Sequence, residues 1–303
     1  MARSVPPALL AESSDLVAAV LGLHFPQERW SDLGRGLAAA APDLGEPDAD
    51  AVARRLRARS LSRAEIEILA SHLTIGETYF FRDPDALRLF EETIVPEVRR
   101  AREHERRIRI WSAGCATGEE PYSIAMLLDR VLPPESGWEA TILGTDINPR
   151  FLRKAAEGIY GAWSFRAMPP GARERWFRSV GKRRWELDPR IRGRVTFVWL
   201  NLATDPFPAL VSETNGVDVI FCRNVLMYFA RDRAEEVARK FHAALAPGGW
   251  LVVGPAETSA TTFSPFEAVH AAGRTVYRKG LRAGMAPVRP HPVVASRPTP
   301  APA

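Results

Sequence analysis

The sequence predicts an α/β protein in which a doubly wound, mostly parallel sheet follows a helical domain and carries a small insertion. From Arg107 onward, short apolar strands alternate with amphipathic helices of about 10–15 residues, the pattern of a doubly wound sheet. Before Arg107, apolar side chains recur at helical spacing and no segment has the character of a strand. Residues 163–194, which are rich in Arg and Trp, interrupt the alternation and predict the insertion.

The helical domain is expected over residues 1–95 and includes a linker helix at its end. Ser62 and Glu65 form a capping-box pattern that predicts the start of one helix. Asp83 and Pro84 predict the start of the linker helix, because Asp caps a helix N-terminus well and Pro is tolerated in the first turn.

The sheet domain is expected over residues 96–280, with the inserted subdomain at 163–194. Its strands are predicted at 107–114, 141–146, 194–202, 217–224, 248–257 and 275–280. Its helices are predicted at 121–132, 149–160 and 233–246. The last stretch, 281–303, holds six prolines and no acid, which predicts a disordered or polyproline-like tail.

The formal net charge of +5 hides an uneven distribution. The insertion carries a net charge of +7, residues 268–303 carry +6, and the rest of the chain carries −8. The protein is therefore an acidic body with a basic insertion and a basic tail. Its pI of about 9.5 is weak evidence for a nucleic-acid or membrane partner.

The sequence argues against export, a membrane span, a disulfide framework and a metal site. The N-terminus lacks the apolar segment of a signal peptide, and no stretch approaches the roughly 18 apolar residues of a membrane span. The only cysteines, Cys115 and Cys222, do not make a disulfide framework, and with no activating group near them in sequence we expect both in the core. The six histidines lack metal-ligand spacing. We expect a cytoplasmic protein with no metal and no membrane insertion.

A glycine turn follows the first predicted strand. Gly114 ends the strand, Gly118 lies in the turn, and a helix begins at Glu120. The spacing matches neither the dinucleotide fingerprint nor the P-loop. Glu119 and Glu120 would repel a pyrophosphate but suit a cationic ligand, such as an adenosyl sulfonium that carries an α-amino group. The alternative is a plain strand–turn–helix with structural glycines.

Asp146 ends the second predicted strand, where an acid can accept hydrogen bonds from both ribose hydroxyls of an adenosine. It follows Gly114 by more than the usual separation of about 20 residues, and the alternative is a helix N-cap. The third strand ends in Cys222-Arg223-Asn224. This ending lacks the polar-Pro-Pro-aromatic tetrad of enzymes that methylate base amines, which argues against a nucleic-acid substrate.

Residues 76–83, with the sequence GETYFFRD, join the helical domain to the rest of the chain. The three aromatic residues 79–81 have a simple alternative role as packing between domains. Arg82 is the stronger functional candidate, because its guanidinium binds carboxylates through two hydrogen bonds.

Together these segments resemble the CheR family, the S-adenosylmethionine-dependent methyltransferases of chemoreceptor glutamates. The resemblance covers roughly residues 10–280 and rests on five motifs: GETYFFRD at 76–83, SAGCATGEEPYS at 112–123, GTDIN at 144–148, NL at 201–202 and FCRNVLMYF at 221–229. It implies a Rossmann-like class I methyltransferase domain with an N-terminal helical domain and a small inserted β-subdomain.

The resemblance also implies roles for single residues. Arg82 and Tyr228 would be the catalytic residues. The cofactor would contact Gly76, Thr78, Arg82, Gly114, Glu120, Asp146, Asn201, Leu202, Arg223 and Asn224. Among these, Glu120 would bind the amino-acid part of the cofactor, Asp146 the ribose, and Asn201 with Leu202 the adenine. Gly76 departs from the family pattern, because many members carry an Asn there that contributes to the cofactor site.

The expected activity is methylation of receptor glutamates to methyl esters, with S-adenosylhomocysteine as the second product. The partner would be an acidic, Glu-bearing receptor helix, and we expect a monomer. Two basic surfaces are candidates for docking it: the insertion, and the cluster Arg54, Arg55, Arg57, Arg59 and Arg63. The alternatives are a methyltransferase that acts on another acceptor and a non-catalytic, S-adenosylmethionine-binding signalling adaptor.

Overall fold

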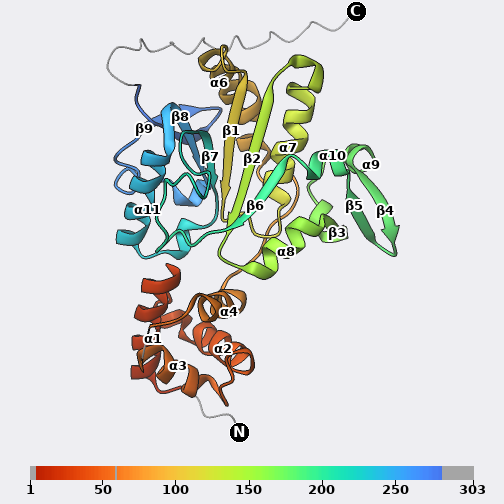
Figure 1. Cartoon of the computed structure of the whole chain (residues 1–303). Coiled ribbons are helices and arrows are strands. Elements are labelled where there is room, and N and C mark those ends of the chain that lie inside the picture. Colours follow the sequence, from red (N-terminus) through yellow and green to blue (C-terminus); the bar gives the residue numbers. More distant parts are fainter. Residues whose placement is uncertain (1–4, 59, 282–303) are drawn as a thin grey trace, which may run out of the picture.

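The computed structural model describes residues 5–58 and 60–281 of the chain. A bundle of helices lies beyond one end of a twisted sheet, and a small three-stranded subdomain projects from the sheet's flank (Figure 1). This confirms the α/β fold class with a helical N-terminal region and an inserted β-subdomain. No helix in the described part of the chain is both long and apolar enough to cross a membrane.

The N-terminal bundle has its own core, built by four short helices. Val17, Leu33, Leu37 and Val52 are among the side chains that this core buries almost completely. Ser62 and Glu65 form the predicted capping box: the Ser62 hydroxyl accepts a hydrogen bond from the Glu65 N–H, and the Glu65 carboxylate accepts one from the Ser62 N–H. The helices are α1 (Pro7–Leu21), α2 (Trp30–Ala40), α3 (Ala49–Ala58) and α4 (Arg63–Leu73).

A helical segment connects the bundle to the sheet. It consists of α5 (Pro84–Leu89), the π-helical turn η3 (Phe90–Ile94) and α6 (Val95–Ala101). Asp83 caps α5, as predicted, by accepting a hydrogen bond from the Ala86 N–H. The apolar side of this segment belongs to the same core as the central strands, so the segment packs on the sheet.

The main sheet has seven strands in the order β6-β2-β1-β7-β8-β10-β9. The first five are parallel, and β10 runs antiparallel to both of its neighbours. Strand β9 was not predicted, because its residues are mostly exposed and lack a clear apolar pattern. The strands are β1 (Arg107–Ala113), β2 (Glu139–Asp146), β6 (Val195–Trp199), β7 (Val217–Cys222), β8 (Leu245–Val253), β9 (Glu267–Ala271) and β10 (Arg274–Arg278).

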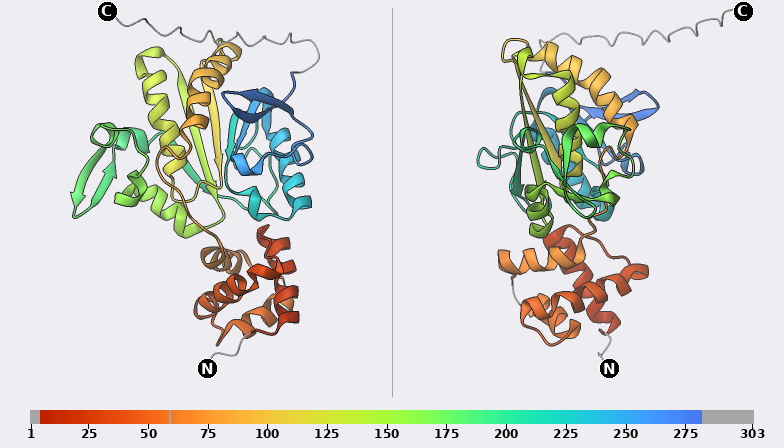
Figure 2. Two further views of the ribbon diagram at one scale, coloured as in Figure 1. Left: turned by 180° about the vertical axis from the view of Figure 1, so that it is seen from behind. Right: turned by 90° about the vertical axis from the view of Figure 1, so that its right-hand side faces the viewer.

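Helices cover both faces of the sheet (Figure 2). Helix α7 (Glu119–Val131) and the segment η3–α6 pack on one face, and α11 (Arg231–Ala244) packs on the other. Helix α8 (Pro149–Glu157) connects β2 to the insertion. From β1 the chain runs outward through β2 to β6, and it then returns to place β7 on the other side of β1. The strand order therefore reverses between β1 and β7. In doubly wound folds, ligands bind in the crevice at the carboxyl ends of such strands.

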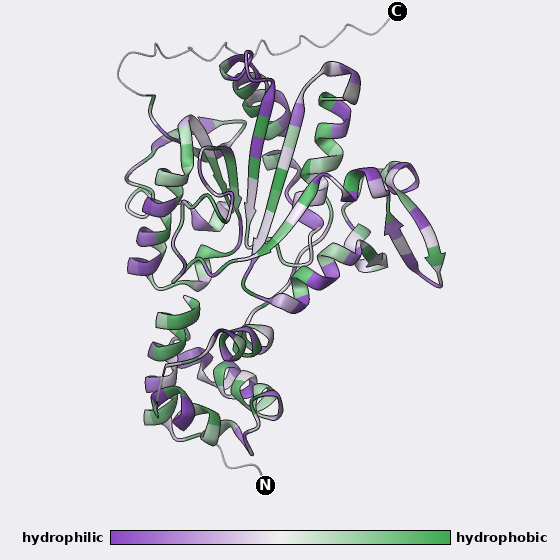
Figure 3. Cartoon of the chain, viewed as in Figure 1, coloured by the Kyte–Doolittle hydropathy of each residue, from purple (hydrophilic) through white to green (hydrophobic). Residues whose placement is uncertain are grey.

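The insertion is an antiparallel sheet in the order β3-β5-β4, with hydrophilic residues on both strands of the β4–β5 hairpin (Figure 3). The prediction that α8 continues to residue 160 was wrong. Gly158 adopts a left-handed φ of 66° and ends the helix, so Ile159 and Tyr160 begin β3. The elements of the insertion are β3 (Ile159–Gly161), α9 (Ala172–Trp176), β4 (Phe177–Gly181), β5 (Arg184–Leu187) and α10 (Pro189–Arg192). The predicted Pro-rich tail lies, after Leu281, outside the described residues.

Candidate functional site

A cleft opens at the carboxyl ends of β1, β2 and β7, where the helical bundle meets the sheet. Its empty volume, open mouth included, is about 1170 Å³. The sequence-predicted residues that line it are Thr78, Arg82, Gly114, Glu120, Asp146, Asn201, Leu202, Arg223, Asn224 and Tyr228. Gly76 is the one predicted site residue that is not part of the lining. The structure thus brings residues from five separate motifs to one place.

The glycine turn is shaped by packing as well as by backbone conformation. Gly114 has a φ of 76°, and a Cβ there would lie 2.4 Å from Cγ2 of Val225. Gly118 has a φ of 93°, and its Cβ would lie 2.8 Å from that of Ala155. These contacts alone explain both glycines, so a ligand would be recognised by the side chains around the turn.

Asp146 is the central acid of the cleft. Its two carboxylate oxygens accept hydrogen bonds from the backbone N–H groups of Ala116, at 2.9 Å, and Asn148, at 2.8 Å. The alternative role as a helix N-cap is wrong, because Asn148 caps α8 with its own side chain. Each carboxylate oxygen keeps a lone pair for a further donor. Burial raises the pKa of Asp146 from 3.8 to about 6.

This raised pKa predicts a pH dependence of cofactor affinity. Ribose hydroxyls that donate to Asp146 favour its ionised form, so protonation below about pH 6 weakens binding. We expect the dissociation constant for S-adenosylmethionine to rise roughly tenfold between about pH 7 and about pH 5 in calorimetric titrations. Asp146→Asn cannot titrate and should bind with weaker, nearly pH-independent affinity. A wild-type affinity that stays constant over this range would contradict the assignment.

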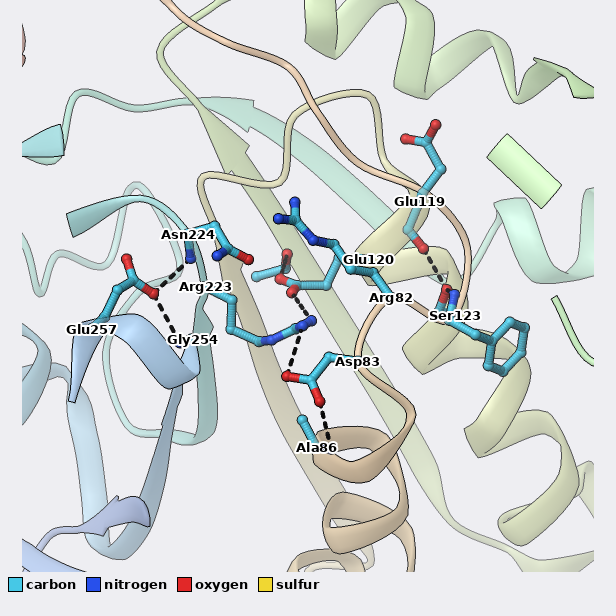
Figure 4. A network of polar contacts seen from close by, with 12 residues as sticks. Arg82, Asp83, Ala86, Glu119, Glu120, Ser123, Arg223, Asn224, Gly254 and Glu257 are labelled. Carbon is cyan, nitrogen blue, oxygen red and sulfur yellow. Dashed lines mark hydrogen bonds and ion pairs between the residues drawn. The ribbon is translucent and has the colours of Figure 1, made fainter. Parts of the chain in front are cut away.

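Glu120 and Arg223 form a buried ion pair beside Asp146. Arg223 Nη1 lies 2.9 Å from Glu120 Oε2, and its Nη2 lies 3.1 Å from Asp83 Oδ2 (Figure 4). The hydroxyl of Ser112 donates to the other Glu120 oxygen at 2.7 Å, and Arg274 pairs with the remaining oxygen of Asp83. The network thus fixes Glu120 at the wall of the cleft. Sequence reasoning placed Asp83 only as a helix cap and missed its two ion pairs.

The two acids of the glycine turn have different surroundings. The carboxylate of Glu119 is buried and accepts hydrogen bonds from the hydroxyls of Thr117, at 2.6 Å, and Ser164, at 2.9 Å. Glu119 does not line the cleft, whereas Glu120 does. Only Glu120 is therefore placed to attract a cationic ligand.

Arg82 extends toward the part of the cleft where Glu120 and Arg223 lie (Figure 4). Its Nη1 donates to the carbonyl oxygen of Glu77 at 2.5 Å, and no carboxylate pairs with it among the described residues. The guanidinium therefore has donors available for a carboxylate ligand. Of the aromatic residues beside it, Phe80 and Phe81 are buried in the core, as the packing alternative proposed, whereas Tyr79 lines the cleft.

Glu257 is a residue of the site that sequence reasoning missed. Its buried carboxylate accepts hydrogen bonds from four backbone N–H groups, at 2.6–3.2 Å, in the segments after β7 and β8: those of Asn224, Val225, Met227 and Gly254. These bonds hold the cleft-lining segment in which Asn224 adopts a left-handed φ of 58°. The sequence signal for Glu257 was its position shortly after β8, whose carboxyl end lies at the same edge of the sheet as the cleft.

Gly76 packs against the ring of Phe151. A Cβ at this position would lie 2.5 Å from Cζ of Phe151, and Phe151 itself lines the cleft. A larger residue at position 76 would require this ring to move. The phenylalanine therefore accounts for the glycine, and it forms part of the cleft wall.

Asn201 is buried and uses its side chain within the protein. Its amide nitrogen donates to the carbonyl oxygen of Val20 in α1 at 2.7 Å, and its amide oxygen accepts from the Ala203 N–H at 3.0 Å. This residue thereby ties the helical bundle to the wall of the cleft.

Neither cysteine is an activated thiol. Cys115 and Cys222 are both buried, and burial raises the pKa of each thiol well above its ordinary value, so neither is an activated nucleophile. Among residues 5–58 and 60–281, no group of three or more His, Cys, Asp or Glu side chains has the arrangement of a metal site.

Residues 76–273 match the family described as "CheR methyltransferase, SAM binding domain". The chain belongs to this family. It is 32% identical over 216 residues to chemotaxis protein methyltransferase 1 of Pseudomonas aeruginosa, a match covering 70% of this chain and 77% of that protein. It is 34% identical to chemotaxis protein methyltransferase 2 of Vibrio cholerae, covering 72% and 74%, and 30% identical to the chemotaxis protein methyltransferase of Borreliella burgdorferi, covering 66% and 70%.

Membership of the CheR family confirms the predicted cofactor, S-adenosylmethionine. The cleft fits this molecule in its chemistry. Asp146 offers a buried carboxylate with lone pairs for two hydroxyl groups, and Glu120 offers a negative charge for an ammonium group. No pyrophosphate-binding glycine pattern competes with this assignment.

Proposed function

We propose that this CheR-family protein methylates glutamate side chains of a chemoreceptor, producing glutamate methyl esters and S-adenosylhomocysteine. The observation that carries the proposal is the composition of the cleft. Two acids, Asp146 and Glu120, suit a cationic nucleoside, and Arg82 in the same cleft has no acid partner among the described residues. Such an arginine in the cleft suits an anionic acceptor. Relatives named as chemotaxis protein methyltransferases support the receptor as the substrate.

The acceptor carboxylate needs no general base, because a free Glu has a pKa near 4.3 and is ionised at neutral pH. S-adenosylmethionine supplies a methyl group on a positively charged sulfur. Asp146 and Glu120 would hold this molecule, and Arg82 would orient the carboxylate. Tyr228 lines the same cleft and would shape the space around the reacting groups. Catalysis then consists of positioning and exclusion of water.

Arg82→Ala separates orientation of the acceptor from cofactor binding. We expect turnover to fall about 100-fold, because the carboxylate loses its orienting partner, while the dissociation constant for S-adenosylmethionine changes less than about threefold. Steady-state kinetics and calorimetry measure the two quantities. Arg88→Ala is a matched control, because Arg88 pairs with Asp85 on the exposed side of α5. Equal losses of turnover and cofactor affinity would refute this role for Arg82.

The two basic candidate surfaces differ in how far their charge is neutralised. In the α3–α4 cluster each described arginine pairs with an acid; Arg59 lies outside the described residues. In the insertion, by contrast, no ion pair engages Lys182, Arg183 or Arg184 among the described residues. These three residues form the exposed turn and strand start of the β4–β5 hairpin. We therefore propose this hairpin as the surface that attracts an acidic receptor helix.

Charge reversal tests this surface. Replacing Lys182, Arg183 and Arg184 by Glu should raise KM for the receptor about tenfold at low salt, and less at high salt, because exposed charges act mainly through screened steering. Affinity for S-adenosylmethionine should not change. Reversal of Arg54 and Arg57 should have the smaller effect, since both are already paired. A larger effect of the α3 variant would assign docking to the helical bundle.

We further propose that the protein acts as a cytoplasmic monomer. The two buried, unpaired cysteines are in keeping with a reducing compartment. Analytical ultracentrifugation would test the oligomeric state, with a single species of about 33.6 kDa as the expected result.

A further inference from the structure

Arg166 belongs to the insertion but contacts the motif that lines the cleft. Its guanidinium carbon lies 3.6 Å from the centre of the Tyr79 ring, and its Nη2 pairs with the carboxylate of Glu77. The same guanidinium lies 4.1 Å from the centre of the Trp163 ring, and its Nη1 donates to the Trp163 carbonyl oxygen at 2.9 Å. Arg166 is therefore anchored in the insertion and makes two independent contacts with the motif.

The segment that Arg166 contacts has few other attachments. Thr74 donates its N–H to the last turn of α4, and Phe80 donates its N–H to the carbonyl oxygen of Ser164 at 2.9 Å. Between them, none of the backbone N–H groups of residues 75–79 donates a hydrogen bond within the described part of the chain. Two carbonyl oxygens of the segment accept hydrogen bonds, both from Arg82: that of Tyr79 from its N–H at 3.3 Å and that of Glu77 from its side chain. Attachment of the segment to the rest of the protein therefore depends mainly on side chains, and Arg166 provides an ion pair and a ring contact.

This segment forms part of the cleft wall and contacts the Arg82 side chain. Thr78 and Tyr79 line the cleft, and Arg82 donates to the carbonyl oxygen of Glu77. An unbroken series of contacts thus runs from Arg166 through Glu77 to the Arg82 guanidinium. We propose that Arg166 is a positioning residue, through which the insertion holds residues 75–79 and orients Arg82 for methyl transfer. This inference rests on the proposed function, in which Arg82 orients the acceptor.

Arg166→Ala tests the inference against a matched control. Arg173 belongs to the same insertion and pairs with Glu174, and its guanidinium carbon lies 4.9 Å from the centre of the Trp185 ring. None of its ion pairs, hydrogen bonds or ring contacts among the described residues involves residues 75–82. We expect Arg166→Ala to lower kcat about tenfold or more, with KM for the receptor and affinity for S-adenosylmethionine within about threefold of wild type. Arg173→Ala should behave as wild type, and Arg166→Lys, which keeps the charge near Glu77, should recover part of kcat.

Limited proteolysis measures the position of the segment without any assumption about the substrate. Arg166→Ala should be cut after Glu77 or Tyr79 about tenfold faster than wild type or Arg173→Ala, because the segment opens more often. If wild type transfers no methyl group to a receptor, the proposed function fails but this comparison still decides whether Arg166 holds the segment.

Two results would overturn the inference. One is an Arg166→Ala variant that matches Arg173→Ala in both proteolysis and kcat. The other is a rise in receptor KM with unchanged kcat, which would make Arg166 a docking residue. If Arg166→Ala does not fold, Arg166→Gln removes the charge that pairs with Glu77 and keeps part of the side chain, and the same comparisons apply.

Discussion

Asp146→Ala is expected to weaken binding of S-adenosylmethionine about 100-fold or more. The variant removes a buried carboxylate that is already oriented by the N–H groups of Ala116 and Asn148 and that has lone pairs free for two ribose hydroxyls. Each hydrogen bond to a charged group contributes about 1.5 kcal/mol or more, so two amount to roughly 3 kcal/mol, or about two orders of magnitude in affinity. Isothermal titration calorimetry measures the change.

A carboxylate elsewhere in the same domain provides the control. Asp129 pairs with Arg194 at 3.1 Å and does not line the cleft, so Asp129→Ala should leave affinity unchanged. An Asp146→Ala variant that binds S-adenosylmethionine within about threefold of wild type would show that the ribose lies elsewhere.

Arg223→Met is expected to destabilise the protein by about 3–5 kcal/mol. The Arg223 side chain is 3% exposed and lies between two carboxylates, so its removal leaves Glu120 without a cation and Asp83 with only Arg274. Breaking a buried ion pair from one side costs this much because the remaining charge stays buried. Thermal unfolding should shift down by roughly 10 °C, and cofactor binding should weaken because Glu120 loses its fixed position.

A second substitution checks the cause of this loss. Adding Glu120→Gln to Arg223→Met removes the uncompensated charge and should recover part of the stability, giving a coupling energy above about 1 kcal/mol in a double-mutant cycle. Arg194→Met, which breaks a more exposed pair, should cost less. Strictly additive effects of the two substitutions would contradict an ion pair that matters for folding.

The meeting of the strand-end residues at one cleft was predictable from their positions in the chain. Gly114 and Arg223 come directly after β1 and β7, Asp146 is the last residue of β2, and the carboxyl ends of neighbouring parallel strands meet at one edge of the sheet. Their proximity therefore follows from the alternation of strands and helices in the chain. The helix starts at Ser62 and Asp83 were predictable for a local reason, since capping depends on residues only a few positions apart.

Features that depend on distant contacts were not predictable from the chain. Three of the four backbone donors to Glu257 lie in the segment after β7, and they reach this carboxylate only when β7 and β8 pair. The ion pairs of Asp83 join residues more than a hundred positions apart. Residues 159–160 continue an apolar pattern that suits a helix or a strand equally, and only pairing with β5 decides for the strand. The contacts of Arg166 with Glu77 and Tyr79 likewise depend on where the folded insertion lies.

Transfer of a labelled methyl group tests the central claim most directly. The protein is incubated with methyl-labelled S-adenosylmethionine and the cytoplasmic part of a candidate chemoreceptor, and the labelled receptor is then treated with mild alkali. The account predicts label on the receptor that alkali releases as volatile methanol, as expected of a glutamate methyl ester, and about 100-fold slower labelling by Arg82→Ala. Label that resists alkali, or tight cofactor binding with no transfer to any receptor, would contradict it.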